Sequence, residues 1–73
     1  MSIVWKPEVQ LSSKRVIRVG DTVELLKEKD FIRKMLGEKP YIVAHIGRWS
    51  CGRYMLYFKT TDGEPGFMAS DFI

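Results

Sequence analysis

The sequence has little cysteine, little histidine and no long apolar run, and each shortage excludes a class of protein. Cys51 is the only cysteine, so the chain cannot form an internal disulfide, and one histidine beside it cannot complete a structural zinc site. No stretch approaches the roughly 20 apolar residues that span a bilayer, and residues 1–7 lack a basic segment followed by an apolar run. These absences favour a cytoplasmic domain with no membrane contact.

Neither sign of charge dominates. Twelve Lys and Arg residues against nine Asp and Glu residues leave a net charge of +3, which permits an anionic partner but is weaker than the basic surface of a dedicated nucleic-acid binder. The apolar content of 45% is too high for a disordered chain. With 73 residues, we expect one folded domain over residues 1–73, with a core that provides little net stability.

Six glycines and three prolines divide the chain into short segments, a density that is typical of short strands. We expect strands over residues 15–19, 22–26, 41–46, 54–60 and 66–69, with Val23 and Leu25 on one buried face. The segment 47–52 and residues 70–73 are expected to be turns. Asp62-Gly63 predicts a tight hairpin, because this pair supplies the positive φ angles of two-residue turns.

The composition changes between residues 27 and 37. Apolar residues at helix-like spacing follow Asp30, which is a suitable helix cap, and Gly37 stands where a C-terminal cap glycine belongs. The apolar residues are Phe31, Ile32, Met35 and Leu36. We expect one or two helical turns near residues 30–36, with these four side chains in the core, while a distorted hairpin is the alternative.

Five short strands are too few for two packed sheets, and one flat sheet would leave exposed edges. Curling into a small barrel buries one face and removes most edges. The sequence therefore predicts a mostly β, five-stranded barrel with a short helical turn in its long loop. A helix packed on a three- or four-stranded sheet is the structural alternative.

Three segments carry a family resemblance. The run Gly66-Phe67-Met68-Ala69-Ser70-Asp71-Phe72-Ile73 resembles the ending of Src-homology-3 (SH3) domains. The segment Gly20 to Leu26 is similar to the strand after their first long loop, and Tyr41 to His45 to the strand that usually carries paired tryptophans and an alanine. The resemblance implies an SH3-like barrel that acts by binding, a fold that also hosts RNA-binding and protein-binding modules.

The residues of the SH3 peptide groove match only in part. Tyr41 and Phe72 match aromatic positions of the groove, but Ala69 stands at the position of its proline. The segment before Gly20 is basic where the family is usually acidic. The resemblance therefore does not imply the usual basic, proline-rich ligand.

The most suggestive binding residues surround Trp49, which Arg48 and Arg53 flank in the segment between Gly47 and Gly52. An exposed indole beside two guanidinium groups can anchor a protein interface, stack on a base or pair with phosphate. The full predicted set of partner-binding residues is Trp49, Arg48, Arg53, Tyr41, Tyr54 and Phe72. The alternative is that Trp49 covers one open end of the barrel.

Other notable side chains have structural explanations. Trp5 is expected to pin the N-terminal segment to the core, and Cys51 to be an ordinary thiol. His45 has no neighbour at a spacing that builds a nucleophile and its base. Two scattered sets are expected to be surface or cap residues: the basic Lys14, Arg15 and Arg18, and the acidic Glu8, Asp21, Glu24, Glu28, Asp30 and Glu38. The sequence therefore predicts no catalytic residue, no metal site and no cofactor.

Three classes of function follow. A cytoplasmic regulatory module that binds a protein is favoured slightly, because the net charge is small and acidic residues are interleaved with basic ones. An RNA- or DNA-binding barrel with stacked aromatics is the alternative. An enzyme built at an oligomer interface, as in a small plasmid-borne reductase with an SH3-like barrel, is disfavoured because that enzyme's Val-Gln-Ile-Tyr stretch is missing. The sequence does not predict the oligomeric state.

Overall fold

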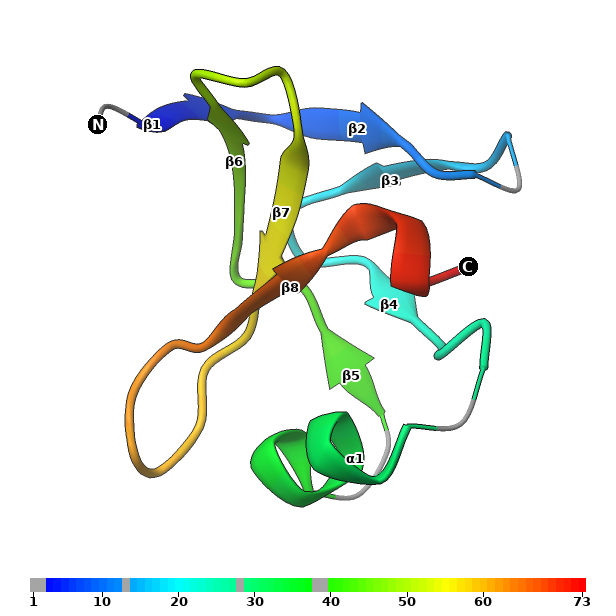
Figure 1. Ribbon diagram of the computed structural model, residues 1–73, viewed down its shortest axis with the longest axis vertical. Helices are drawn as coiled ribbons and strands as arrows, with labels where there is room; N and C mark the ends of the chain where they lie inside the picture. The colour runs from blue at the N-terminus through cyan, green and yellow to red at the C-terminus, as the bar shows by residue number, and fades with distance from the viewer. Residues whose placement is uncertain (1–2, 13, 28, 38–39) are drawn as a thin grey trace.

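The structure, a computed structural model, describes residues 3–12, 14–27, 29–37 and 40–73. Its largest unit is an antiparallel four-stranded sheet with the order β1-β6-β7-β8, formed by β1 (Ile3–Lys6), β6 (His45–Trp49), β7 (Tyr54–Tyr57) and β8 (Gly66–Met68). Two pairs complete the strands: β2 (Glu8–Gln10) with β3 (Val16–Arg18), and β4 (Thr22–Val23) with β5 (Tyr41–Ile42). In Figure 1, β1 lies beside β6 at the top of the view, and α1 (Asp30–Leu36) lies next to β5 at the bottom.

The prediction of a mostly β domain is confirmed, but the prediction of five strands in a closed barrel is wrong. The described residues form eight strands in three sheets, and no closed barrel is found among them. The segment 41–46 divides because its backbone changes partner: the Val43 N–H donates to the Asp21 carbonyl at 3.0 Å, whereas the Ala44 N–H donates to the Tyr57 carbonyl at 2.8 Å. Residues 3–10, which were not predicted to be extended, add β1 and β2.

The core lies on one side of the four-stranded sheet. Ile46 of β6, Leu56 of β7 and Phe67 of β8 are buried, and they lie side by side across the three strands. Val23 is buried and Leu25 packs against the same core, which confirms their predicted shared face. The rest of the buried apolar set is Val9, Leu11, Ile17, Ile32, Tyr41, Val43, Phe58, Ala69 and Phe72.

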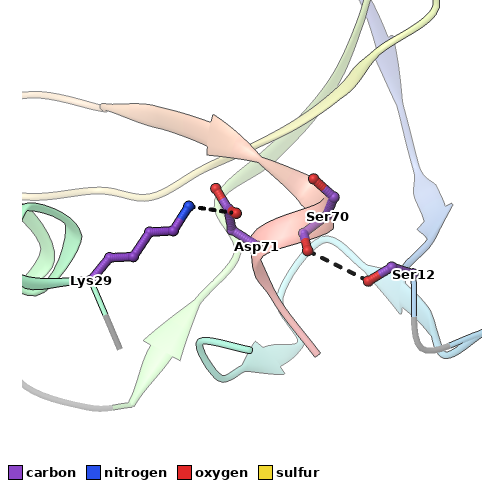
Figure 2. Close-up of polar contacts among 4 residues, drawn as sticks. All are labelled: Ser12, Lys29, Ser70 and Asp71. Atoms are coloured by element: carbon purple, nitrogen blue, oxygen red, sulfur yellow. Dashed lines mark hydrogen bonds and ion pairs between the residues drawn. The ribbon is translucent and has the colours of Figure 1, made fainter. Parts of the chain in front are cut away.

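The C-terminal residues are tied into the fold from several sides. The predicted final turn is a 3-10 helix, η1 (Ala69–Asp71), and the Glu24 and Ile73 backbones exchange hydrogen bonds of 2.9 and 2.8 Å. Figure 2 shows Lys29 in an ion pair with Asp71 at 3.0 Å, and the Ser12 hydroxyl donating to the Ser70 carbonyl at 3.5 Å. These contacts hold Phe72, which is fully buried, in the centre of the core.

The helix forms at the predicted place, with two corrections. Lys29, not Asp30, is the N-terminal cap residue, whereas Gly37 is the C-terminal cap with a φ of 78° and an N–H donated to the Arg33 carbonyl. Only Ile32 and Leu36 reach the core; Phe31 and Met35 are 57% and 53% exposed. A seven-residue helix turns one stripe inward, so four apolar side chains cannot all be buried.

Two predicted turns differ from the structure. Gly47 and Arg48 belong to β6, so the connection to β7 covers only residues 50–53. In the next hairpin Thr60 pairs with Gly63, which places Thr61 and Asp62 at the centre of the turn, and Gly63 has the positive φ of 138°. Glu28, Glu38 and residues 1–2, whose roles were also predicted, lie outside the described residues.

Replacement of Phe72 by alanine tests the central position of this side chain. Because Phe72 has no exposed surface, F72A removes a full ring from the core and costs about 3 to 5 kcal/mol, which is comparable to the whole stability of a domain of this size. We expect the variant to be largely unfolded in urea titrations followed by circular dichroism. F31A, at a ring that is 57% exposed, is the matched control and should cost less than about 1 kcal/mol.

Candidate functional site

The side of the four-stranded sheet that faces away from the core carries an unusual set of side chains. Successive strand residues point to opposite faces, so the neighbours of the buried Ile46, Leu56 and Phe67 point outward. We call this surface the outer face. It consists of Ile3, Trp5, His45, Gly47, Trp49, Met55, Tyr57, Gly66 and Met68.

Tyr57 lies at the centre of the outer face, between two glycines. A Cβ atom added at Gly66 would lie 2.8 Å from Cδ2 and 3.0 Å from Cζ of the Tyr57 ring, and one added at Gly47 would lie 3.2 Å from its Cε1. At Gly66 the ring would have to shift to admit even a methyl group, whereas at Gly47 it would have to give way by a few tenths of an ångström, and Cγ2 of Ile3 is nearer still, at 2.7 Å. The two glycines therefore let the Tyr57 ring approach the backbone of both neighbouring strands.

Two tryptophans and a histidine contact this ring or one another. Trp5 meets Tyr57 edge to face, with ring centroids 5.5 Å apart and planes at 67°, and it lies at the same centroid distance from His45. The indole N–H of Trp49 donates to the Tyr57 hydroxyl at 3.1 Å. We call Trp5, His45, Trp49 and Tyr57 the aromatic cluster.

The position of Trp5 corrects a prediction. Its side chain was expected to pin the N-terminal segment to the core, but it is 59% exposed and packs on the outer face, away from the buried residues. Position 5 of β1 pairs with Gly47, and the absence of a side chain there leaves room for the indole to lean across the strand. Trp5 is thus the most exposed aromatic residue of the cluster.

His45 has an acidic partner that local sequence spacing does not reveal. Its Nδ1 lies 2.8 Å from Oε1 of Glu64, a residue of the β7–β8 connection. The sequence analysis considered only residues near His45 in the chain, whereas the hairpin returns residue 64 to the start of β6. This contact holds the imidazole beside Trp5.

The sheet that carries the aromatic cluster has no carboxylate in its strands. The sequences of β1, β6, β7 and β8 contain Lys6, His45 and Arg48 but neither Asp nor Glu. Within the described part of the chain, Arg48, Arg53 and Lys59 form no ion pair, whereas Glu8 pairs with Arg18 at 3.8 Å and Asp71 with Lys29. The strands beneath the cluster therefore contribute no negative charge to it.

The structure does not bring the six predicted binding residues together. Tyr41 and Phe72 are 3% and 0% exposed, so they belong to the core instead of the surface. The hydroxyl of Tyr41 donates to the Gly37 carbonyl at 3.1 Å, which ties the strand to the end of α1. Their burial leaves these two aromatic rings no surface on which to contact a partner.

The other four predicted residues lie near the β6–β7 connection, but on both sides of the sheet. Trp49 is half-buried on the outer face; it neither covers a barrel end nor stands free. Tyr54 points to the opposite side and packs on the core. Arg53 is exposed and, with Tyr54, lines a groove that residues 10–12 and 68–70 also border. The exposed Arg48 pairs with Tyr54 in the ladder and so lies on the side opposite to the outer face.

Residue-by-residue reasoning missed Trp5, Tyr57, Gly47 and Gly66 as members of a site. The sequence does contain a signal for a shared face. Residues 45, 47 and 49 are spaced two apart, as are residues 55 and 57, and this is the spacing of side chains on one side of a strand. Assignment of residue 47 to a turn hid the first alternation. Which strands would be neighbours could not be predicted from this pattern alone.

Among the described residues, no group of three or more His, Cys, Asp or Glu side chains could hold a metal ion, and Cys51 is an exposed free thiol. None of the helices in the described part of the chain has the length and apolar character needed to cross a membrane.

The close contact between Gly66 and Tyr57 gives a test of the cluster's architecture. G66A places a methyl group against the ring, so we expect it to destabilise the fold by about 1 to 3 kcal/mol in urea unfolding. In a Y57A background the same change has no ring to meet, and it should be neutral or stabilising by up to about 1 kcal/mol, because alanine suits a strand better than glycine. Equal costs in both backgrounds would show that the ring does not occupy this position.

Comparison with known proteins adds no relative. The chain matches no family model, no curated protein and no solved structure. The resemblance to SH3 domains therefore stays a prediction, and the function has to be inferred from the geometry of the outer face.

Proposed function

We propose that this protein is a small binding module that holds a macromolecular partner on its outer face. One observation carries the proposal: the aromatic cluster is preorganised by Tyr57 and leaves Trp5, on the edge strand β1, 59% exposed. The proposal keeps Trp49 as a contact residue, with Arg53 at the rim, and adds Trp5, His45 and Tyr57; Arg48 is left out because it lies on the opposite side of the sheet. A catalytic role is not part of it.

The exposure of Trp5 has an energetic cost that a structural role does not explain. Burial of a large apolar side chain stabilises a protein by about 1.5 to 3 kcal/mol, so an indole that is 59% exposed forgoes roughly half of that gain. A domain of this size has little stability to lose. Contact with a partner would recover the unused burial energy.

The residue types around the cluster suit a binding surface. Trp, Tyr, Met and Arg are the residues enriched in interfaces and in their energetic hot spots. The outer face holds the first three, including Met55 and Met68, and Arg53 lies at its end beside Trp49. The protein partner that the sequence favours and the nucleic-acid alternative both fit this composition.

Capture of partners from a lysate of the source organism tests the proposal when the bait is varied at Trp5. Immobilised wild-type protein and the F31A variant should retain the same partner, because Phe31 is 57% exposed on α1, away from the outer face. W5A should retain at least about fivefold less, since loss of a hot-spot aromatic costs more than about 1 kcal/mol of binding. Quantitative mass spectrometry and nucleic-acid staining measure the recovery.

The same three baits define the contradicting result. Equal recovery by W5A and wild type, with both baits folded by circular dichroism, would remove the outer face as the contact surface. A loss confined to F31A would move the contact surface to α1.

A further inference from the structure

We infer that the partner held on the outer face is a single-stranded nucleic acid, whose bases stack on Trp5 and Tyr57 and whose phosphates meet the basic side chains at the two ends of the cluster. The inference rests on the proposed function, because it names the ligand of the same surface. Three features support it: the charge around the cluster, the arrangement of its rings and the dimensions of the face.

The charge around the outer face is complementary to a polyanion. The four strands beneath it contain no carboxylate, and Glu64, the acidic residue that reaches the cluster, is engaged by His45. Arg53 pairs with Trp49 at one end, and Lys59 follows β7 at the other end, where it lines a hollow together with His45. These two cations have no ion-pair partner among the described residues, so they are free to bind phosphate.

The small net charge of the whole chain does not oppose this inference. Several acidic side chains are occupied elsewhere: Glu8 by Arg18, Asp71 by Lys29, and Asp21 by the backbone N–H of Arg18 at 3.0 Å. These three acidic residues therefore have partners of their own outside the four-stranded sheet. Electrostatic attraction to a ligand depends on the charges near the binding surface, within about one Debye length of roughly 10 Å.

The rings are arranged as a stacking surface for unpaired bases. Trp5 is 59% exposed and is held at 67° to the partly buried Tyr57 ring, so its indole is presented to solvent in a fixed orientation. Stacking of a base on an aromatic side chain requires a base that is not already paired and stacked in a duplex. The cluster therefore favours single strands over double strands.

The dimensions of the face fit a short segment of such a strand. From His45 to Trp49, β6 advances four residues, about 13 Å at the usual rise of a strand. A few nucleotides cover this length, and a strand lying along β6 would pass Trp5 at its middle, since Trp5 pairs with Gly47. The cations at both ends then lie near its phosphates.

Binding of fluorescein-labelled oligonucleotides to the purified full chain tests the inference directly. Fluorescence anisotropy with dT12, rU12 and a matched 12-base-pair duplex should show saturable binding of the single strands at 20 mM salt, and weaker binding of the duplex. W5A should weaken binding of the single strands about 5- to 150-fold, the effect of one lost stacking partner. W5F keeps a ring and should retain part of the affinity, while F31A should bind like wild type.

Salt dependence provides a second readout that concerns the basic residues. The double variant R53Q/K59Q should reduce the slope of log affinity against log salt concentration by about 1.4 for single strands if each of the two side chains meets one phosphate. The same change at K14Q/R15Q, on the β2–β3 connection away from the outer face, should leave the slope unchanged.

Two outcomes would overturn the inference. One is the absence of any anisotropy change with dT12 and rU12 at 20 mM salt; the other is binding that W5A leaves unchanged. If, in addition, the lysate experiment recovers a nuclease-resistant protein in a Trp5-dependent way, then the partner is a protein and the proposed function survives without its nucleic-acid ligand. If neither experiment depends on Trp5, both proposals fail.

Discussion

The outer face depends on the contact between one aromatic ring and two glycines. Tyr57 lies against Gly47 on one neighbouring strand and Gly66 on the other, where a Cβ atom at either position would meet its ring. In this position its hydroxyl accepts a hydrogen bond from the indole N–H of Trp49, and its ring makes an edge-to-face contact with Trp5. Without the two glycines, a bulkier strand residue would displace the ring and separate the two tryptophans.

This constraint also explains how a small domain maintains an exposed aromatic surface. The opposite side of the same strands carries Ile46, Leu56 and Phe67, which join Phe72 in the core. Stability is therefore provided by one face of the sheet, and the other face is left for recognition. The C-terminal tie, in which Lys29 binds Asp71 and Glu24 pairs with Ile73, keeps Phe72 in place and does not use the outer face.

Sequence patterns predicted the local structure better than the site. The mostly β composition, the helix over residues 30–36 and the shared face of Val23 and Leu25 are confirmed, because they depend on neighbours within a few residues. Trp5, its pairing with Gly47 and the contact of His45 with Glu64 depend on which distant strands become neighbours. A one-dimensional pattern does not specify that pairing, and so Tyr41 and Phe72 were predicted as surface residues although both fill the core.

The most direct test of the account is a two-dimensional NMR titration of the ¹⁵N-labelled protein with unlabelled dT12. The two indole N–H signals, from Trp5 and Trp49, report on the cluster itself. The account predicts that the Trp5 signal and the backbone amides of β1, β6 and β7 shift together during the titration, while the amides of α1 stay unchanged. Unchanged indole signals, or shifts confined to α1 or the β2–β3 pair, would contradict it.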